Sequence, residues 1–478
     1  MQQTKRHLIP ALLGLLVIAA LALAGYLQSQ APDLPAIPEL AVADFSQPVQ
    51  EQLLAARAQL LEAPEDAQRN LELGRILHAY KLLPSAIVCY RRARLLQPEE
   101  FATVYLLGIA QIQVGDDAGA TDNLRAALAL NPDDAPARLR LGEVLFKGGK
   151  LEEARALFEA LLKQQPDSAW AHHRLAQVLA ALGDPVGAID QNRRAIELYE
   201  NFGAAQYALA LAYRDRGELQ LAEAHMARYR EHPEQSPAHV DALLEALDAL
   251  DISATAQVRR AKRLERAGRM QDALQALQQA VAVEPDSVEA HSQLVRMYHR
   301  FNDTGRAEQH YRAVTAIEPN AVMVNLEYGT LLAEQGRIAD AATAFEKVLT
   351  ADPDHSAAHT LLAQAREELQ QPAEAERHYR LALDSDPNNH RAALLLGRLL
   401  MLGERHTEAE PFLELAGAAE PRERAFYLQR IAQVRHEAGQ REQALAVLEQ
   451  ARAQAAELGQ QYLLNEIMQT QTQWQESP

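Results

Sequence analysis

The sequence predicts an all-α fold, an α-α superhelix of stacked helix pairs that follows an N-terminal transmembrane helix. Strong helix formers dominate the 478 residues, and aromatic residues make up only 5% of them. Prolines recur with a stride of 34 residues in two runs, at Pro98, Pro132 and Pro166 and then at Pro285, Pro319, Pro353, Pro387 and Pro421. A constant period of this size is typical of solenoids built from two-helix units.

The N-terminus predicts a membrane anchor. Residues 1–7 carry Lys5 and Arg6, and residues 8–27 are uncharged and mostly apolar, a length that crosses a hydrocarbon core of about 30 Å. The next basic residue is Arg57, so the positive-inside rule keeps residues 1–7 in the cytoplasm and exports the remainder. We therefore expect one crossing of a bacterial inner membrane, with the body in the periplasm. A cleaved signal peptide, ending near Ala24, is the alternative and also gives a periplasmic body.

Two further segments precede the repeats. Residues 28–48 contain Pro32, Pro35, Pro38 and Pro48, a composition that favours an extended linker. Residues 49–66 show apolar side chains at helical spacing before Pro64, which predicts a leading helix that covers the first repeat.

Aligning the chain on its prolines shows which other columns recur. The first helix of a unit carries a Leu-Gly or Leu-Ala pair, such as Leu141-Gly142, and the second helix carries an alanine, such as Ala154. A large residue, here Phe158, follows that alanine by four positions and so lies on the same helical face. We expect this large side chain to fill the space beside the small residue of the partner helix.

Turns fall between these helices. Gly115, Gly149, Gly183, Gly217, Gly268 and Gly336 stand where the chain passes from the first helix to the second. A glycine adopts a left-handed backbone there without steric cost. After the closing proline an Asp or Asn often follows, as at Asp134, and such a residue caps the next helix.

These columns resemble tetratricopeptide repeats. The resemblance runs over residues 67–235 as units 1–5 and over residues 254–451 as units 6–11. It implies a right-handed superhelix of antiparallel helix pairs with a concave groove. The sixth unit departs from the pattern, with Arg260-Ala261 where other units have Leu-Gly.

A phase break separates the two blocks, because 119 residues lie between Pro166 and Pro285, three periods plus 17. The surplus falls in residues 236–253, where Leu243, Leu244 and Leu247 stand at helical spacing. This half-repeat insertion is either a spacer that tunes curvature or a functional segment in or beside the groove. At the other end, residues 452–478 predict a capping helix and tail, because the last unit otherwise exposes its apolar face.

Composition and motifs predict no catalytic, cofactor or metal site. No Gly-rich phosphate loop, H-E-x-x-H motif or nucleophile elbow occurs in the sequence. The single cysteine, Cys89, lies in an apolar stretch typical of a buried residue. The net charge of −18 disfavours a nucleic-acid partner, and no small-molecule substrate is expected.

The resemblance implies that the first helices line the groove, and it places a set of basic and aromatic residues there: Tyr105, Arg140, Phe146, Lys147, Trp170, His173, Arg174, Tyr207, Arg214, Arg259, Lys262, Arg266, Arg296 and Arg300. Arginine pairs well with carboxylates, so an acidic or extended protein segment is the expected ligand. The alternative is that these residues belong to solvated helix faces.

We therefore predict a non-enzymatic scaffold for protein–protein interaction that binds a partner segment in the groove. Membrane-anchored repeat proteins of this kind resemble envelope assembly factors for cytochrome c maturation, surface polysaccharide export or pili. A structural accessory subunit of a periplasmic or membrane enzyme complex is the alternative.

Overall fold

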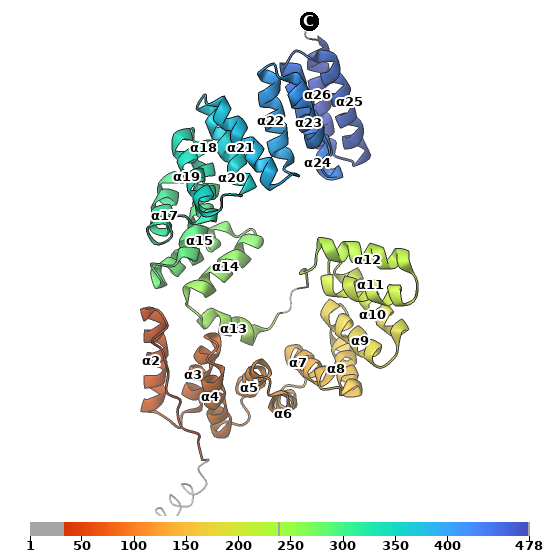
Figure 1. Cartoon of the computed structure of the whole chain (residues 1–478). Helices are drawn as coiled ribbons and strands as arrows, with labels where there is room; N and C mark the ends of the chain where they lie inside the picture. The colour runs from red at the N-terminus through yellow and green to blue at the C-terminus, as the bar shows by residue number, and fades with distance from the viewer. Residues whose placement is uncertain (1–32, 238–239, 477–478) are drawn as a thin grey trace, which may run out of the picture. The chain divides into compact units, whose positions relative to one another are not determined.

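The computed structural model describes residues 33–237 and 240–476, and every regular element in these ranges is a helix (Figure 1). This confirms the all-α prediction. The predicted cytoplasmic N-terminus (1–7) and transmembrane segment (8–27) lie outside the described residues. Within the described ranges, no helix combines the length and apolar character that a membrane crossing requires. The chain forms two compact units, Met1–Ile252 and Ser253–Pro478.

The described part of unit 1 contains a leading helix, then five helix pairs and a final single helix. Its helices are α2 (Gln47–Glu62); α3 (Ala67–Ala79) and α4 (Leu83–Leu96); α5 (Phe101–Val114) and α6 (Asp117–Leu130); α7 (Ala135–Lys147) and α8 (Leu151–Gln164); α9 (Ala169–Ala181) and α10 (Pro185–Leu198); α11 (Gly203–Asp215) and α12 (Leu219–Glu231); and α13 (Ala242–Leu250).

Unit 2 is a second run of helix pairs, closed by α26. Its helices are α14 (Ala254–Arg266) and α15 (Met270–Val283); α16 (Val288–Arg300) and α17 (Thr304–Ile317); α18 (Val322–Glu334) and α19 (Ile338–Ala351); α20 (Ser356–Glu368) and α21 (Pro372–Ser385); α22 (His390–Leu402) and α23 (His406–Gly417); α24 (Pro421–Glu437) and α25 (Arg441–Glu457); and α26 (Gln461–Glu476).

The described end of the predicted linker is fastened to unit 1. The guanidinium of Arg57 on α2 donates to the carbonyl of Pro38 at 2.9 Å, and Arg92 on α4 donates to the carbonyl of Pro35. The ring of Phe45 meets that of Tyr80 edge-on at 5.7 Å. Residues 33–46 contain no helix but follow the surface of the first pair.

Local sequence signals set the helix ends. Asp134 caps α7, because its side chain accepts from the Ala137 amide at 2.8 Å. Gly115 and Gly336 end first helices with φ values of 81° and 74°, which confirms the predicted left-handed turns. At the equivalent turn of the next repeat after Gly336, Gln370 has a φ of 62°, so an ordinary side chain carries the steric cost there.

The small residue of each first helix packs against the large residue of the second. A Cβ atom on Gly142 of α7 would lie 2.6 Å from a ring carbon of Phe158 on α8. Gly329 and Phe345 repeat this contact in unit 2, also at 2.6 Å. Both phenylalanines are almost fully buried. The predicted alternation of small and large residues is therefore what allows the two helices of a pair to approach closely.

The first helices of successive pairs form one wall of each unit, which we call the concave wall. Within each unit, a first helix packs on the second helix of its own pair, and a second helix packs on the first helix of the next pair. Successive first helices also touch one another, as α3 does α5 and α14 does α16. Helices on the inner side of a curved array are the more crowded, so the first helices line the inside.

The predicted insertion, residues 236–253, contains α13. This helix packs against α3, at the opposite end of unit 1 from α12, which precedes it in the chain (Figure 1). The chain thus turns back from the fifth helix pair to the first.

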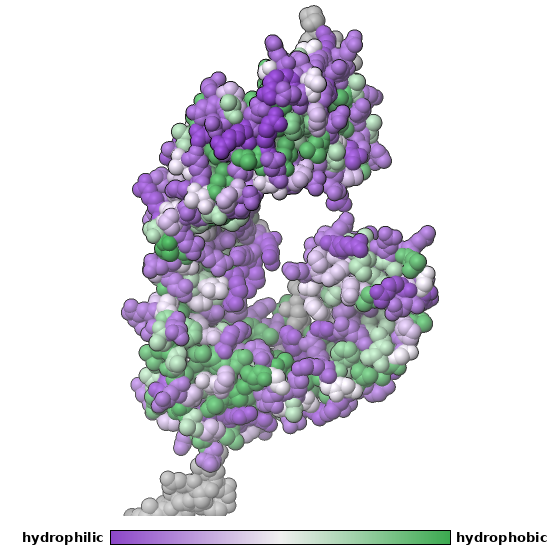
Figure 2. All heavy atoms as spheres, in the orientation of Figure 1, coloured by the Kyte–Doolittle hydropathy of each residue, from purple (hydrophilic) through white to green (hydrophobic). Residues whose placement is uncertain are grey.

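The last helix, α26, covers the end of unit 2. Ile467 on α26 is fully buried in a cluster with Leu448, Ala451 and Ala455 of α25. Elsewhere on the face seen in Figure 2, hydrophilic side chains predominate and apolar ones form separate patches.

Candidate functional site

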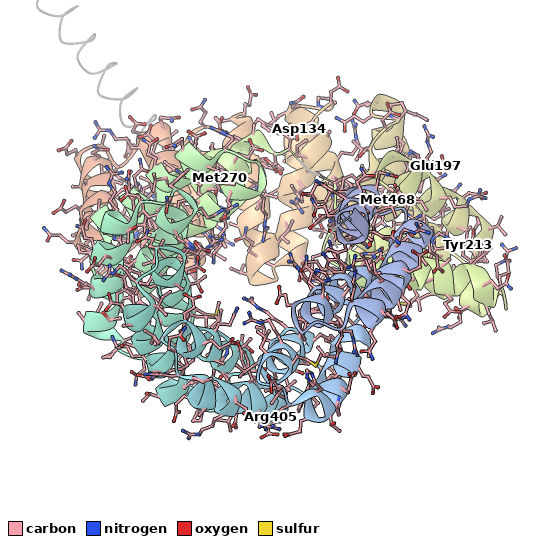
Figure 3. All side chains as sticks on the ribbon, turned by 90° about the horizontal axis from the view of Figure 1, so that it is seen from above. Asp134, Glu197, Tyr213, Met270, Arg405 and Met468 are labelled. Atoms are coloured by element: carbon pink, nitrogen blue, oxygen red, sulfur yellow. The ribbon has the colours of Figure 1, made fainter. Side chains whose placement is uncertain are left out.

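A pocket of about 590 Å³ lies on the concave wall of unit 2, where α14, α16 and α18 meet. Its charged and apolar lining includes Lys262, Glu265, Arg266, Met270, Arg296, Arg300, Met323 and Glu327. Met323 is 71% exposed, which is unusual for a large apolar side chain. Figure 3 labels Met270, at the start of α15. The pocket therefore combines basic groups with accessible methionine surface.

Glutamates neutralise part of the positive charge in this pocket. Glu265 accepts from Arg296 at 2.8 Å and also pairs with Arg300. Lys262 pairs with Glu289 at 2.9 Å. Two arginines thus share one carboxylate, and among the described residues Arg266 makes no ion pair. The net charge of the pocket remains positive, but it is smaller than a count of the basic residues alone predicts.

Unit 1 repeats the arrangement. Arg140 and Arg174 both pair with Glu143, at 3.0 and 2.8 Å. The guanidinium of Arg174 also lies over the Trp170 ring, 5.4 Å from its centre. Lys147 pairs with Asp117 at 2.8 Å. The structure therefore brings the predicted basic residues of α7 and α9 together on the concave wall, each with an acidic partner.

The predicted aromatic residues are not all available to a partner. Tyr105 is 1% exposed and His173 is 2% exposed, so neither side chain presents a free surface to a partner in this structure. The Nδ1 atom of His173 lies 2.8 Å from Asn192 of α10, and burial lowers the pKa of this histidine. Phe146 is half-buried, and Tyr207 is 42% exposed beside Tyr229.

Two further predicted residues lie apart from these clusters. Arg214, in the last turn of α11, is exposed and contacts the neighbouring Asp215 at 3.2 Å. Arg259 is an exposed residue of α14 that interacts with its surroundings. On the outer edge of unit 2, Arg405, labelled in Figure 3, pairs with Glu376 at 2.6 Å. Arginine–glutamate pairs are therefore not confined to the concave wall.

No group of histidine, cysteine or acidic side chains in the described residues is arranged to hold a metal ion. Cys89 is buried, and burial raises the pKa of its thiol to about 12. A thiol with so high a pKa is a poor nucleophile, because the thiolate is the reactive form.

The sequence matches the family model described as tetratricopeptide repeat over residues 111–178, 149–195, 264–333 and 366–431, and a second model of the same description over residues 326–390. The chain belongs to the tetratricopeptide repeat family. The columns that predicted the resemblance are the ones that form the helix crossings, with Gly142 against Phe158 as the example described above.

Two curated relatives each align with part of the chain. The chain is 28% identical to DnaJ homolog subfamily C member 3 of Mus musculus over 151 residues, which cover 32% of this chain and 29% of that protein. It is 32% identical to the cytochrome c-type biogenesis protein CycH of Rhizobium meliloti over 181 residues, 36% of this chain and 47% of that protein. The chain thus spans less than half the length of each.

Solved structures that are similar to part of the chain include those of PilW and MamA. PilW, described as a widely conserved type IV pilus biogenesis factor, has 20% identity and a TM-score of 0.38, over 45% of this chain and 98% of that chain. MamA has 22% identity and a TM-score of 0.33, over 34% of this chain and 95% of that chain.

The tetratricopeptide repeats also contain a polar contact that sequence reasoning missed. A side chain six residues after the closing proline donates to the carbonyl of that proline, as Asn70 does to Pro64 (3.1 Å), His291 to Pro285 (2.8 Å) and His359 to Pro353 (2.9 Å). The signal was available as a recurrent Asn or His at this position. Where it occurs, this hydrogen bond fastens the loop to the helix that follows, and its role is structural.

Proposed function

We propose that this protein is a non-enzymatic scaffold that binds a segment of a partner protein on the concave wall of unit 2. The pocket beside α14, α16 and α18 carries the proposal. There Glu265 serves two arginines, Arg266 is unpaired among the described residues, and Met323 offers exposed apolar surface. Such a surface suits an extended segment that carries both carboxylates and apolar side chains.

The proposed setting is the bacterial envelope. Residues 8–27 would anchor the protein in the inner membrane, and the repeats would face the periplasm. The likeness to CycH, named for cytochrome c-type biogenesis, supports a role as an envelope assembly factor. Protease added to spheroplasts should then digest the repeats, while protection of the repeats would contradict the proposed location.

Charge substitution tests the binding surface. Full-length protein carrying Arg266→Gln and Arg300→Gln should lose most of its crosslinked partner when intact envelopes are crosslinked and analysed by mass spectrometry. Arg312→Gln on α17 is the matched control, because that side chain is 75% exposed and pairs only within its own helix. Equal capture of the partner by the wild-type protein, the double variant and the Arg312→Gln control would contradict the groove assignment.

Ionic strength separates this proposal from a permanent subunit interface. Exposed ion pairs weaken as the Debye length falls from about 10 Å at 0.1 M salt to about 3 Å at 1 M. A partner held by the arginines of unit 2 should therefore elute as salt is raised. Retention at 1 M salt would instead favour an accessory subunit of an envelope enzyme complex.

A further inference from the structure

The insertion returns along the concave wall of unit 1. We call residues 235–237 and 240–252 the strap. At its start the Gln235 carbonyl accepts from the amide of Gly203, the first residue of α11, at 2.9 Å. At its end the Ile252 amide donates to the hydroxyl of Tyr80, which caps α3, at 3.0 Å. The strap thus crosses unit 1 from the last repeat to the first, opposite to the order of the repeats.

Asp241 is the polar centre of the strap. Its Oδ1 atom accepts from the Leu244 amide at 3.1 Å and caps α13, and its Oδ2 atom accepts from the Tyr105 hydroxyl of α5 at 2.5 Å. The residue is only 5% exposed. A buried carboxylate is costly unless it is hydrogen-bonded, and here both oxygens have donors. Tyr105, which the sequence placed in the groove, therefore contacts a segment of this chain.

Apolar and main-chain contacts complete the fit. Leu247 on α13 is 5% exposed, and Leu244 shares a pocket of about 230 Å³ with Ile109 of α5 and Val144 of α7. By contrast, Val240 in the same strap is 68% exposed. One face of the strap thus packs against the concave wall, and the other face is exposed to solvent.

Two carbonyl groups of the strap also find donors on unit 1. The Trp170 indole of α9 donates to Pro237 at 2.8 Å, and the Gln52 amide of α2 donates to Leu250 at 3.1 Å. Contacts to a carbonyl do not depend on the side chain of the residue that supplies it. They fix the path of a bound segment, while Asp241, Leu244 and Leu247 supply its sequence preference.

We propose that the concave wall of unit 1 is a receptor for a short amphipathic helix that has an aspartate at its N-cap and leucines three and six residues later. The strap occupies this receptor within the chain, and a partner segment of the same chemistry displaces it. The inference rests on the proposed function only in that the protein binds partner segments. It assigns unit 1 a second, separately controlled site.

The covalent connection explains why such a site would remain closed by default. A segment tethered by a short linker has an effective concentration on the order of millimolar. A free helix must compete with the tethered strap, so its apparent affinity is reduced to the intrinsic affinity multiplied by the fraction of receptor that is open. Weakening the strap should therefore tighten the binding of a free segment.

A labelled peptide with the sequence of residues 240–252 tests this directly. Fluorescence anisotropy should show that full-length protein carrying Leu247→Ala binds the peptide at least tenfold more tightly than the wild-type protein does. Val240→Ala is the matched control, because it truncates an exposed residue of the same strap and should leave the affinity unchanged. A peptide carrying Leu247→Ala itself should bind at least tenfold more weakly to the released protein.

Hydrogen exchange on the wild-type protein gives a test that needs no variant. The amides of α13 should be protected, and a saturating amount of the peptide should accelerate their exchange, while the Leu247→Ala peptide should not. Unchanged exchange, or equal affinity of the wild-type and Leu247→Ala proteins, would overturn the proposal and leave the strap as a spacer. A concentration-dependent dimer of the Leu247→Ala protein, with α13 protected, would also overturn the proposal, because it would indicate that two copies exchange their straps.

These outcomes are independent of unit 2. If the peptide fails to bind while Arg266→Gln and Arg300→Gln still abolish partner capture, the receptor in unit 1 is refuted and the scaffold function stands. If the peptide binds as expected while the Arg266→Gln and Arg300→Gln protein still captures its partner, only the assignment of the partner to unit 2 is refuted.

Discussion

Arg296 of α16 and Glu265 of α14 form a bidentate ion pair, with Nη1–Oε1 at 3.0 Å and Nη2–Oε2 at 2.8 Å. The two residues are 31 positions apart and lie on the first helices of successive repeats. Arg398 and Glu367 form a pair at the same spacing, at 2.7 Å. Such pairs connect one repeat to the next on the concave wall. The arginines there therefore stabilise the packing of the repeats, in addition to any contact they make with a partner.

Replacing Arg296 should weaken unit 2. The Glu265 side chain is only 16% exposed and the Arg296 side chain 37%, so Arg296→Gln leaves a partly buried carboxylate with Arg300 as its remaining cation. We expect the free energy of unfolding to fall by about 1 kcal/mol. Urea unfolding followed by circular dichroism measures this. Arg312→Gln removes a 75% exposed side chain that pairs within its own helix, so it should change stability by less than about 0.5 kcal/mol. A comparable loss in both variants would contradict the inter-repeat role.

The repeat architecture could be predicted from the sequence because the residues that pack between helices recur at equivalent positions of each repeat. A small residue in one helix and a large one in its neighbour must face each other for the helices to cross, and this requirement leaves a period of 34 residues in the sequence. The contact of Gly142 with Phe158 is the physical origin of that signal. The turn glycines are equally local, since a positive φ strongly favours glycine.

The charge of the groove could not be predicted in the same way. The family resemblance predicts the arginine positions, but Glu143 pairs with Arg174 and Glu265 pairs with Arg296 from neighbouring helices, and a count of basic residues omits such partners. The burial of His173 against Asn192 likewise depends on the adjoining helix. The path of the strap rests on contacts such as Tyr105 with Asp241, 136 residues apart, which no local pattern reveals.

Adding a methyl group at the helix crossing should destabilise its repeat. In Gly142→Ala the new Cβ would lie 2.6 Å from the Phe158 ring, so the two helices must separate or the ring must leave its position. We expect a loss of about 1 to 3 kcal/mol in urea unfolding. Gly148→Ala is the control in the same repeat, because its Cβ would meet nothing closer than 3.4 Å and its φ is −78°. Phe158→Leu should recover part of the loss in the double variant, and strict additivity would contradict a direct clash.

One turn of unit 2 should be improved by glycine. Gln370 has a φ of 62°, and Gly336, at the equivalent turn of the preceding repeat, has a φ of 74°. The left-handed conformation costs an ordinary residue about 1 to 2 kcal/mol, part of which glycine loses again through the entropy of the unfolded chain. Gln370→Gly should therefore raise the midpoint of thermal unfolding, and Gly336→Ala should lower it. The same direction of change in both variants would show that backbone conformation is not the cause.

Two histidine pairs should make unit 2 sensitive to acid. His291 donates from Nε2 to the Pro285 carbonyl at 2.8 Å, so its Nδ1 atom must accept the hydrogen bond from Nδ1 of His310 at 2.8 Å. His359 and His378 form the same arrangement at 3.0 Å. Protonating both rings of a pair would place two donors against each other, so each pair requires at least one neutral ring.

The pKa values give the direction and range of the effect. Burial, followed by the charge of His291, lowers the pKa of His310 from 6.5 to about 4, and burial and His359 lower that of His378 to about 4. A group with a lowered pKa binds protons more readily when the chain is unfolded. Its contribution is therefore complete above about pH 6.5 and is lost as the pH falls toward 4. Urea midpoints for unit 2 should fall between pH 7.5 and pH 5, and less steeply when His310→Gln and His378→Gln supply amide donors that do not titrate.

His299 provides a control of opposite sign. Burial lowers its pKa, but hydrogen bonds to Glu334 and Glu327 outweigh burial and raise it above 6.5. A raised pKa contributes stability that is fully present below pH 6.5 and is lost as the pH rises through the folded value. His299→Gln should therefore cost more stability at pH 5 than at pH 8, whereas the His310 and His378 substitutions should show the reverse. If all three substitutions gave the same pH dependence, a general effect of net charge would explain the acid sensitivity, and the paired imidazoles would not.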